Sequence, residues 1–207
     1  MSEVPANAAL IGGLIEACRE VIAVNADHLS ELDRAIGDGD HGTNMCRGLE
    51  AVYAERSRLA ELPLPKALEE TGLTLVMSVG GAAGPLYGTL LIEIGRHLAG
   101  ANGQIAFARA LEHAIDAVAR RGRASAGDKT LLDVLYPVHA EVVRRAGLAG
   151  IAEQAERAAS LTFGMKAMRG RAAFLGDRSV GHVDPGAKSC ALLTAAICRF
   201  LEEQCPA

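Results

Sequence analysis

The residues with the clearest chemical potential lie in one short stretch, from Leu32 to Asn44, which reads LDRAIGDGDHGTN. It carries three aspartates, Asp33, Asp38 and Asp40, separated by glycines that let the backbone turn tightly. Clustered carboxylates repel one another unless they are protonated, dispersed into solvent or neutralised by a cation. Hard cations such as Mg²⁺ and Ca²⁺ prefer oxygen ligands of this kind. The stretch therefore indicates either a metal site or a solvated acidic turn, and the surrounding elements must decide between them.

The composition describes a chain that can bury a substantial core. Of its 207 residues 50% are apolar, only 3% are aromatic and none is tryptophan. Apolar residues recur at helical spacing, and no window alternates as a half-buried strand would. The net charge of −4 argues against a general nucleic-acid binder, and no apolar run approaches the roughly 20 residues that span a bilayer. We therefore expect a single all-α domain over residues 1–207 that binds neither nucleic acid nor a membrane.

The N-terminus and the cysteines bear on the cellular compartment. Glu3 and Pro5 stand where a secretory signal would have a basic start leading into an apolar run. The five cysteines show neither a C-x-x-C pair nor a zinc-type spacing. An odd number of dispersed cysteines fits a reducing environment, so we expect a cytoplasmic protein.

The spacing of apolar residues predicts eight helices, over about 8–32, 43–61, 66–79, 84–100, 104–121, 128–147, 148–165 and 184–203. Asp128 is expected to cap the sixth. In an up-and-down antiparallel bundle or barrel, the four odd-to-even connections fall at one end. These are the connections that are dense in glycine and functional side chains: 33–44, 80–89, 122–130 and 164–186. The N-termini of the even helices should therefore meet there, and their unpaired N–H groups suit phosphate.

The connection from Met165 to Pro185 is unusually long for one without evident secondary structure. It is locally basic, with Arg171 and Arg178 among its cations, whereas residues 31–40 are locally acidic. A basic arm and an acidic cradle at one end of a bundle are what a polyphosphate–metal complex requires. A mobile, solvated loop is the alternative interpretation.

Other motifs fit poorly. Residues 37–42 match G-x-G-x-x-G, but the dinucleotide-binding fingerprint requires a preceding strand, and a helix is expected here. An EF-hand that starts at Asp38 would place Leu49 at the position of the bidentate glutamate. No serine lies in a nucleophile-elbow context and no Cys–His pair can be placed. We therefore expect no covalent catalysis, although His41 and His182 lie in the glycine-rich connections.

Four stretches together carry a resemblance to a known family: LDRAIGDGDHGTNM (32–45), SVGGAAGPLYGT (78–89), GDKTLLDVLYP (127–137) and GRAAFLGDRSVGHVDPGA (170–187). Taken in this order, they make the sequence closely resemble the nucleotide-binding L subunit of bacterial dihydroxyacetone kinase. The match covers essentially the whole chain. The resemblance implies a barrel of eight antiparallel helices with the nucleotide at one end.

By this resemblance, Asp33, Asp38 and Asp40 are Mg²⁺ ligands that hold two ions against the phosphates of ADP or ATP. The residues implied to line the nucleotide are His41, Gly42, Thr43, Asn44, Ala82, Ala83, Gly84, Gly122, Leu131, Arg171, Asp184, Pro185 and Gly186. The sequence departs from the family's usual pattern at Ala83, where serine is common, and at Ala173-Phe174, where Ser-Tyr is common. Neither departure touches the expected metal ligands.

The resemblance also implies an activity and partners. Phosphoryl transfer would run from the Mg²⁺-bound nucleotide to dihydroxyacetone, which a separate K subunit holds covalently. In split systems the bound ADP is rephosphorylated by a phosphotransferase-system M subunit. The alternatives are a kinase subunit for another small ketose such as erythrulose that uses free ATP, a nucleotide-dependent partner of a transcriptional regulator, and a stand-alone metal hydrolase.

Overall fold

The computed structural model of the chain describes residues 3–100 and 103–204, and these residues include no strand. The helices are α1 (Glu3–Val24), α2 (Ala26–Ile36), α3 (His41–Ala54), α4 (Arg56–Ala60), α5 (Leu64–Ser78), α6 (Ala83–Leu98), α7 (Gln104–Gly122), α8 (Leu132–Val143), α9 (Leu148–Leu161) and α10 (Pro185–Gln204), with two 3₁₀ helices, η1 (Thr162–Gly164) and η2 (Arg171–Ser179). The predicted all-α class is confirmed.

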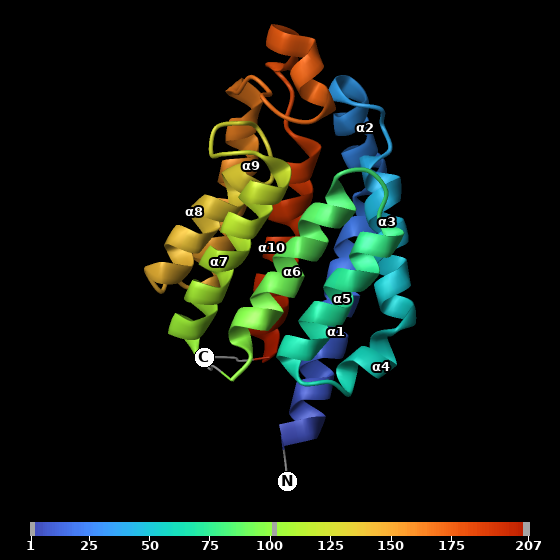
Figure 1. Cartoon of the computed structure of the whole chain (residues 1–207), viewed down its shortest axis with the longest axis vertical. Helices are drawn as coiled ribbons and strands as arrows, with labels where there is room; N and C mark the ends of the chain where they lie inside the picture. The colour runs from blue at the N-terminus through green and yellow to red at the C-terminus, as the bar shows by residue number, and fades with distance from the viewer. Residues whose placement is uncertain (1–2, 101–102, 205–207) are drawn as a thin grey trace.

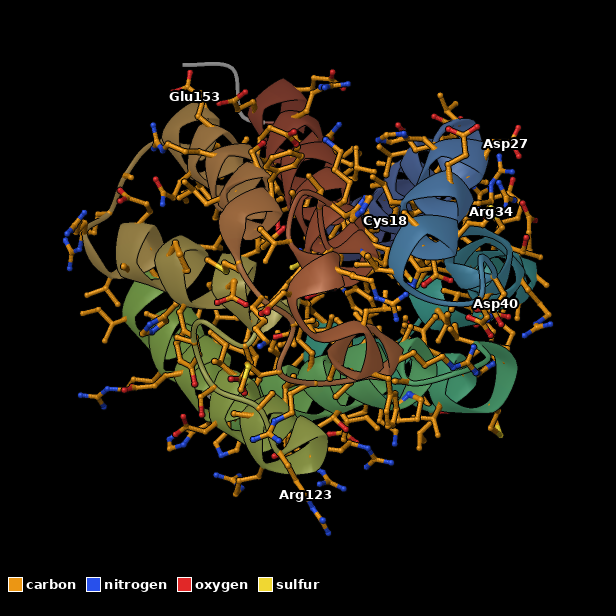
Figure 2. The ribbon with its side chains drawn as sticks, turned by 90° about the horizontal axis from the view of Figure 1, so that it is seen from above. Cys18, Asp27, Arg34, Asp40, Arg123 and Glu153 are labelled. Atoms are coloured by element: carbon orange, nitrogen blue, oxygen red, sulfur yellow. The ribbon has the colours of Figure 1, made fainter. Side chains whose placement is uncertain are left out.

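The α-helices pack side by side in a closed ring (Figure 1). α1 packs against α3 and α3 against α5, each later helix packs against the next as far as α10, and α10 returns to α1. Seen from above, the ribbons surround a packed interior, with Asp40 and Arg123 on different sides of the ring (Figure 2). The ring has the eight positions that the sequence predicts, because α1 and α2 share the first position and α3 and α4 share the second.

Small and medium apolar side chains fill the interior of the ring. The most deeply buried include Ile22, Leu29, Leu59 and Ile115, and many alanines of α7, α9 and α10 are buried with them. Such a core without large aromatics lets neighbouring helices approach closely at native packing density. No helix of the described residues combines the length and the apolar character needed to cross a membrane.

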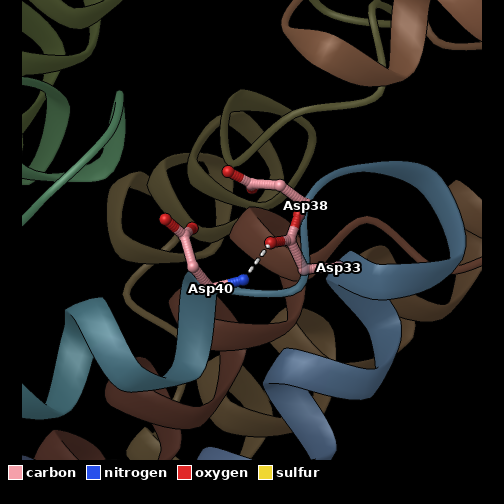
Figure 3. A group of neighbouring side chains, drawn as sticks. All are labelled: Asp33, Asp38 and Asp40. Atoms are coloured by element: carbon pink, nitrogen blue, oxygen red, sulfur yellow. Dashed lines mark hydrogen bonds between the residues drawn. The ribbon is translucent and has the colours of Figure 1, made fainter.

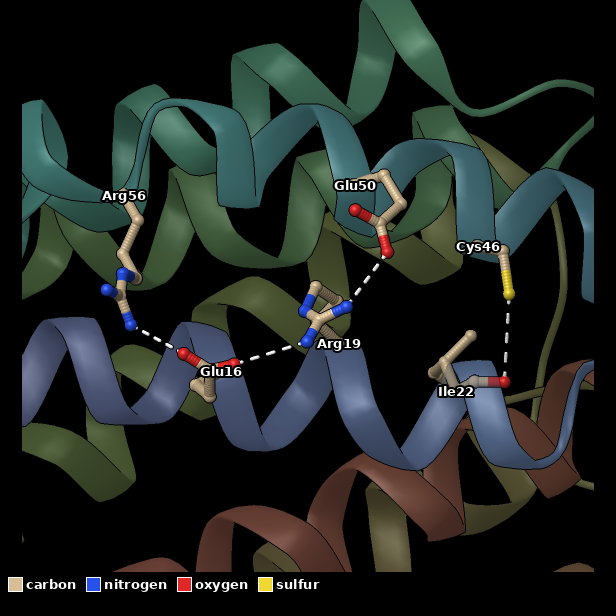
Figure 4. A network of polar contacts seen from close by, with 6 residues as sticks. All are labelled: Glu16, Arg19, Ile22, Cys46, Glu50 and Arg56. Carbon is tan, nitrogen blue, oxygen red and sulfur yellow. Dashed lines mark hydrogen bonds and ion pairs between the residues drawn. The ribbon is translucent and has the colours of Figure 1, made fainter.

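A polar network joins α1 to α3 and α4 (Figure 4). Glu16 accepts hydrogen bonds from Arg19 at 3.2 Å and from Arg56 at 2.5 Å, and Arg19 also donates to Glu50 at 3.1 Å. Both arginines lie over the ring of Tyr53, 4.5 and 5.1 Å from its centroid. The network holds the first two positions of the ring together without any contact to the glycine-rich connections.

Two predicted helices are broken in the structure. The first, expected over 8–32, divides at Asn25, whose side-chain amide donates to the Val21 carbonyl at 2.8 Å and so competes with the helical backbone. α2 then continues to Ile36, beyond the expected end. The second, expected over 43–61, breaks at Glu55, whose N–H bonds to the Val52 carbonyl in a tighter turn, and it continues as the short α4.

The sixth helix, expected over 128–147, begins later and ends earlier as α8. The prediction that Asp128 caps it was wrong, because the Asp128 carboxylate pairs with Arg169 at 3.3 Å. Asp133, in the first turn of α8, reaches back and accepts the N–H groups of Gly127 at 2.5 Å and Thr130 at 2.8 Å. The buried carboxylate of Asp133 thus closes the α7–α8 connection from inside the helix.

The long connection before α10 has more structure than its sequence suggests. The seventh helix, expected to reach residue 165, ends as α9 at Leu161 and gives way to η1. Residues 165–184, which we call the strap, contain η2. The strap crosses one end of the ring, at the top of Figure 1. Since η2 also packs against α2, the strap bridges the two sides of this end.

Candidate functional site

The N-termini of α3, α6, α8 and α10 open onto one cavity at the end of the ring that the strap crosses. Its volume is about 540 Å³, within the range of small-molecule sites. These four helices occupy the even positions of the ring, so the predicted convergence of their N-termini is confirmed. Each N-terminus contributes partial positive charge, which favours a bound anion.

One wall of the cavity carries the three aspartates (Figure 3). One carboxylate oxygen each from Asp33, Asp38 and Asp40 lies within 4.8 Å of the others. Asp33 Oδ2 also accepts the N–H groups of Asp40 at 2.9 Å and His41 at 3.2 Å, so the end of α2 caps the start of α3. Gly37 makes this possible, because a Cβ there would lie 2.2 Å from Asp33 Oδ1.

This donor set fits a hard divalent cation. Ligands on opposite sides of an octahedral Mg²⁺ lie about 4 Å apart, so small side-chain rotations bring these oxygens onto one ion or a pair of ions. Asp33 commits one oxygen to the backbone and keeps the other for a ligand. The carboxylate of Asp38 pairs with the guanidinium of Arg171, which supplies positive charge to the cluster from the strap.

A second wall is formed by the α5–α6 connection and the first turn of α6. Ala82 and Ala83 line the cavity there. Gly84 is buried, and a Cβ on it would lie 2.5 Å from the Val79 carbonyl oxygen, so only glycine lets α6 begin this close to α5. Ala83 lacks the hydroxyl that a serine would offer at this position, and the wall presents backbone groups in its place.

A hydrogen-bonded chain joins α3, α10 and α6 beside the cavity. His41 Nε2 lies 2.9 Å from Ser189 Oγ, and the Tyr87 hydroxyl lies 2.8 Å from the same oxygen. Burial lowers the pKa of His41, although the charges of Asp33 and Asp40 act in the opposite direction. Burial also raises the pKa of Tyr87 well above its ordinary value. The imidazole and the phenol are therefore neutral groups that fix three helix starts relative to one another.

Asp184 ends the strap and caps α10. Its Oδ2 accepts the Ala187 N–H at 2.7 Å, and its own N–H donates to Thr162 Oγ1 at 3.0 Å. Burial raises the pKa of Asp184 to about 7, and the Ala187 hydrogen bond and the charge of Lys129 oppose that shift. Without further positive charge nearby, this carboxyl is only partly ionised at neutral pH.

The structure brings most of the expected site residues to this cavity. Its lining includes Asp33, Asp38, Asp40, His41, Asn44, Ala82, Ala83, Gly122, Leu131, Arg171, Asp184, Pro185 and Gly186. Gly42, Thr43 and Gly84 do not line it. Gly42 and Gly84 are buried against neighbouring backbone, and the side chain of Thr43 is exposed. These three residues lie in the first turns of α3 and α6, where backbone N–H groups rather than side chains are available.

Several lining residues were not expected from the sequence. Leu86 and Val118 add an apolar side to the cavity, and Arg121 and Arg169 add positive charge. Lys129 also lines it, yet its side chain is almost completely buried. The local basic character of the strap signals Arg169, whereas no periodicity in the sequence separates Leu86 and Val118 from ordinary core positions.

A closed ring of helices, with four N-termini and a carboxylate cluster around one end cavity, defines a class of proteins equipped to hold an anion together with a divalent metal. The sequence profile of the DAK2 domain matches residues 35–199 of this chain, which is more than half of its length. The chain belongs to the DAK2 domain family.

Curated relatives agree with this assignment. The chain is 39% identical over 188 residues to the ADP-binding subunit of PEP-dependent dihydroxyacetone kinase from Escherichia coli (strain K12), a match that covers 83% of this chain and 87% of that protein. It is 38% identical over 182 residues to the ADP-binding subunit of PEP-dependent dihydroxyacetone kinase 1 from Listeria innocua serovar 6a, with 86% and 89% covered. A D-erythrulose kinase from Mycolicibacterium smegmatis is 35% identical over 96% of this chain, which corresponds to 37% of that longer protein.

Solved structures share the fold. The native dihydroxyacetone kinase of C. freundii aligns with a TM-score of 0.76 at 23% identity, over 92% of this chain and 34% of that one. A second structure of the C. freundii enzyme, in complex with AMP-PNP and Mg²⁺, aligns with a TM-score of 0.73 at 25% identity over the same shares. These matches confirm the helical architecture independently of the sequence profile.

Proposed function

We propose that this chain is the nucleotide-binding subunit of a dihydroxyacetone kinase. As a phosphotransferase, it presents a phosphoryl group on Mg²⁺-bound ATP to dihydroxyacetone held by a separate substrate-binding subunit. The observation that carries the proposal is the end cavity, in which three aspartates face the N-termini of four helices. The names of the Escherichia coli and Listeria innocua relatives, both ADP-binding subunits, support it. The C. freundii structure with AMP-PNP and Mg²⁺ supports it as well.

In this proposal the phosphates lie between the aspartates and the helix N-termini. Asp33, Asp38 and Asp40 would hold two Mg²⁺ ions, which would supply positive charge against the charge that develops on the transferred phosphoryl group. Backbone N–H groups at the starts of α3 and α6, including those of Thr43 and Gly84, donate to phosphate oxygens. These donors are fixed before the nucleotide arrives, so they need no reorganisation during the transfer.

The strap and the apolar side complete the proposed nucleotide site. Arg171, which pairs with Asp38 in this structure, would offer its guanidinium to a phosphate oxygen as a charge-assisted hydrogen bond. Leu131 and the α7 end at Gly122 lie on the apolar side of the cavity and border the adenine.

The chain supplies no covalent nucleophile in this mechanism. His41 is half-buried, neutral and bonded to Ser189, so it positions the start of α3. Rate enhancement comes from holding the phosphoryl group in line with a hydroxyl that the partner subunit presents. The bound ADP is restored by a phosphotransferase-system M component, as the PTS-dependent name of the Lactococcus lactis relative suggests.

Reconstitution tests the proposed function. The purified chain, a K-type subunit, Mg²⁺ and dihydroxyacetone are combined either with ATP or with phosphoenolpyruvate and the phosphotransferase-system proteins, and triose phosphate is measured in a coupled assay. We expect product that depends on this chain and on the K-type subunit. Erythrulose as a competing acceptor tests the ketose specificity. Absence of phosphorylated ketose with either donor would contradict the proposal.

A further inference from the structure

Lys129 is the largest fully buried side chain of the described residues, with 1% of its surface exposed. Lysine is almost never buried in this way unless its charge is matched. The residue lies in the α7–α8 connection and adopts a left-handed backbone conformation, with φ of +62°, which a residue with a side chain rarely adopts. Both features indicate that the surrounding structure holds Lys129 in place for a purpose other than packing.

The ammonium group of Lys129 is fully occupied. Nζ donates to the carbonyl oxygens of Met165 at 3.1 Å, Ser179 at 2.6 Å and His182 at 2.6 Å. An ammonium has three hydrogens, so none is left to contact a phosphate. Burial lowers the pKa of Lys129, and the charge of Asp184 opposes that shift. Although Lys129 borders the cavity, its charge is directed at the protein backbone.

One of the three carbonyl acceptors, that of Met165, stands at the beginning of the strap, and the other two, those of Ser179 and His182, stand near its end. The same α7–α8 connection holds the strap at a fourth point, where the Asp128 carbonyl accepts the Met168 N–H at 3.1 Å. Within the strap, Ser179 Oγ accepts the Ala167 N–H at 2.8 Å. Lys129 is therefore the centre around which the strap folds.

The position of Arg171 depends on this arrangement. Arg171 lies in the strap between two segments that Lys129 holds, and its guanidinium reaches across to Asp38 on the opposite wall. The Arg171 side chain is 60% exposed, so the strap backbone rather than side-chain packing fixes where it starts. A shift of the strap would move the guanidinium away from the metal and phosphate end of the cavity.

We propose that Lys129 is a positioning residue that holds the strap against the barrel and thereby places Arg171 at the anion-binding end of the cavity. The assignment of that anion as nucleotide phosphate rests on the proposed function. The hold on the strap does not depend on any ligand, because all three acceptors are backbone carbonyls of the chain itself.

The test uses the full chain with Lys129→Met, which keeps the length of the side chain but removes its charge. In the ligand-free protein we expect hydrogen exchange of strap amides to accelerate roughly tenfold or more, with the barrel helices unchanged, because charged hydrogen bonds are lost. Calorimetric titration with ADP and Mg²⁺ should show roughly tenfold or greater weakening. The matched control is Lys166→Met in the same strap, which breaks an exposed ion pair to Asp177 and should change either quantity by less than about twofold.

A double-mutant cycle separates positioning from a purely structural role. If Lys129 acts through Arg171, then Lys129→Met in an Arg171→Ala background should change ADP affinity by less than about twofold. Additive losses would overturn the proposal, and so would a Lys129→Met protein with wild-type strap exchange and ADP affinity.

A second variant covers the case in which Lys129→Met fails to fold. Ser179→Ala removes the hydroxyl that accepts from Ala167 but keeps the Ser179 carbonyl that Lys129 uses. We expect faster strap exchange and a loss of ADP affinity that again disappears in the Arg171→Ala background. Faster strap exchange with a loss of ADP affinity that persists in the Arg171→Ala background would show that the strap does not act through Arg171 and would overturn the proposal. If the wild-type chain binds no ADP, the proposed function fails, while strap exchange in the ligand-free chain still tests the hold by Lys129.

Discussion

The two ends of the barrel use charged side chains differently. At the end opposite the cavity, charges pair with one another on the surface, as Lys66 Nζ does with Glu70 at 3.0 Å. At the cavity end, the charged groups of Asp33, Asp133 and Lys129 bond to backbone groups of the connections. Exposed ion pairs contribute about 0–1 kcal/mol each, whereas hydrogen bonds to charged groups contribute about 1.5–3 kcal/mol. The cavity-end connections are thus held in defined shapes by charged groups.

The largest expected effect concerns the aspartates at the cavity end. Asp40→Asn removes a charged metal ligand, so Mg²⁺-dependent ADP binding should weaken by about 100-fold or more, measured by calorimetric titration. The matched control is Asp177→Asn, which neutralises a highly exposed aspartate of the strap and should leave ADP affinity within about twofold. Near-normal ADP binding by Asp40→Asn would show that Asp40 is not a metal ligand.

The next effect compares stability at the two ends. Asp133→Ala leaves the N–H groups of Gly127 and Thr130 without their acceptor, so the free energy of unfolding should fall by about 2 kcal/mol. Lys66→Ala at the opposite end should lower it by less than about 0.5 kcal/mol. Chemical denaturation measures both values. Equal losses of unfolding free energy in Asp133→Ala and Lys66→Ala would contradict the stronger hold on the cavity-end connections.

A smaller effect concerns the backbone that shapes the acidic wall. Gly37→Ala places a methyl group against Asp33 Oδ1, so ADP affinity should fall about tenfold as the aspartate is displaced. The control is Gly12→Ala within α1, where no atom lies within 4 Å of the added Cβ. That substitution should raise the free energy of unfolding by about 0.5–1 kcal/mol and leave ADP binding unchanged. Wild-type affinity in Gly37→Ala would show that Asp33 tolerates the shift.

The smallest effect is a pH dependence at Asp184. Its folded pKa of about 7 lies above the ordinary value of 3.8, so the native state binds this proton more tightly than the unfolded state does. Stability from this group is therefore present below about pH 4 and is lost as pH rises toward and through 7. Compared with Asp184→Asn, the ligand-free wild type should lose unfolding free energy progressively as the pH rises from 4 to 8. Parallel pH profiles of unfolding free energy in the two proteins would refute the assignment.

The sequence predicts that the four glycine-rich connections lie at one end of the ring. This inference was possible because it depends only on the number and order of the helices. Eight periodic segments joined by short turns must alternate in direction, so connections 33–44, 80–89, 122–130 and 164–186 meet whatever the details of each helix. The clustering of Asp33, Asp38 and Asp40 follows in the same way, since their separation along the chain is short.

Features that depend on distant contacts were not predictable from local patterns. Lys129 bonds to carbonyls that lie 36, 50 and 53 residues further along the chain, and nothing near it in the sequence signals such partners. The break at Asn25 depends on one side-chain hydrogen bond that an uninterrupted apolar pattern conceals. The prediction that Asp128 caps the sixth helix was wrong, and the carboxylate that bonds to this connection belongs to Asp133, inside the helix.

Calorimetric titration of the nucleotide-free wild-type chain with ADP, once with Mg²⁺ and once with a chelator, tests most directly whether the cavity is a metal–nucleotide site. We predict saturable binding with Mg²⁺ that is lost in the chelator. ADP at a hundredfold excess over Kd should then raise the free energy of unfolding by about 2.7 kcal/mol. Absence of binding with Mg²⁺, or equal binding in the chelator, would contradict the assignment of Asp33, Asp38 and Asp40 to a metal that holds the nucleotide.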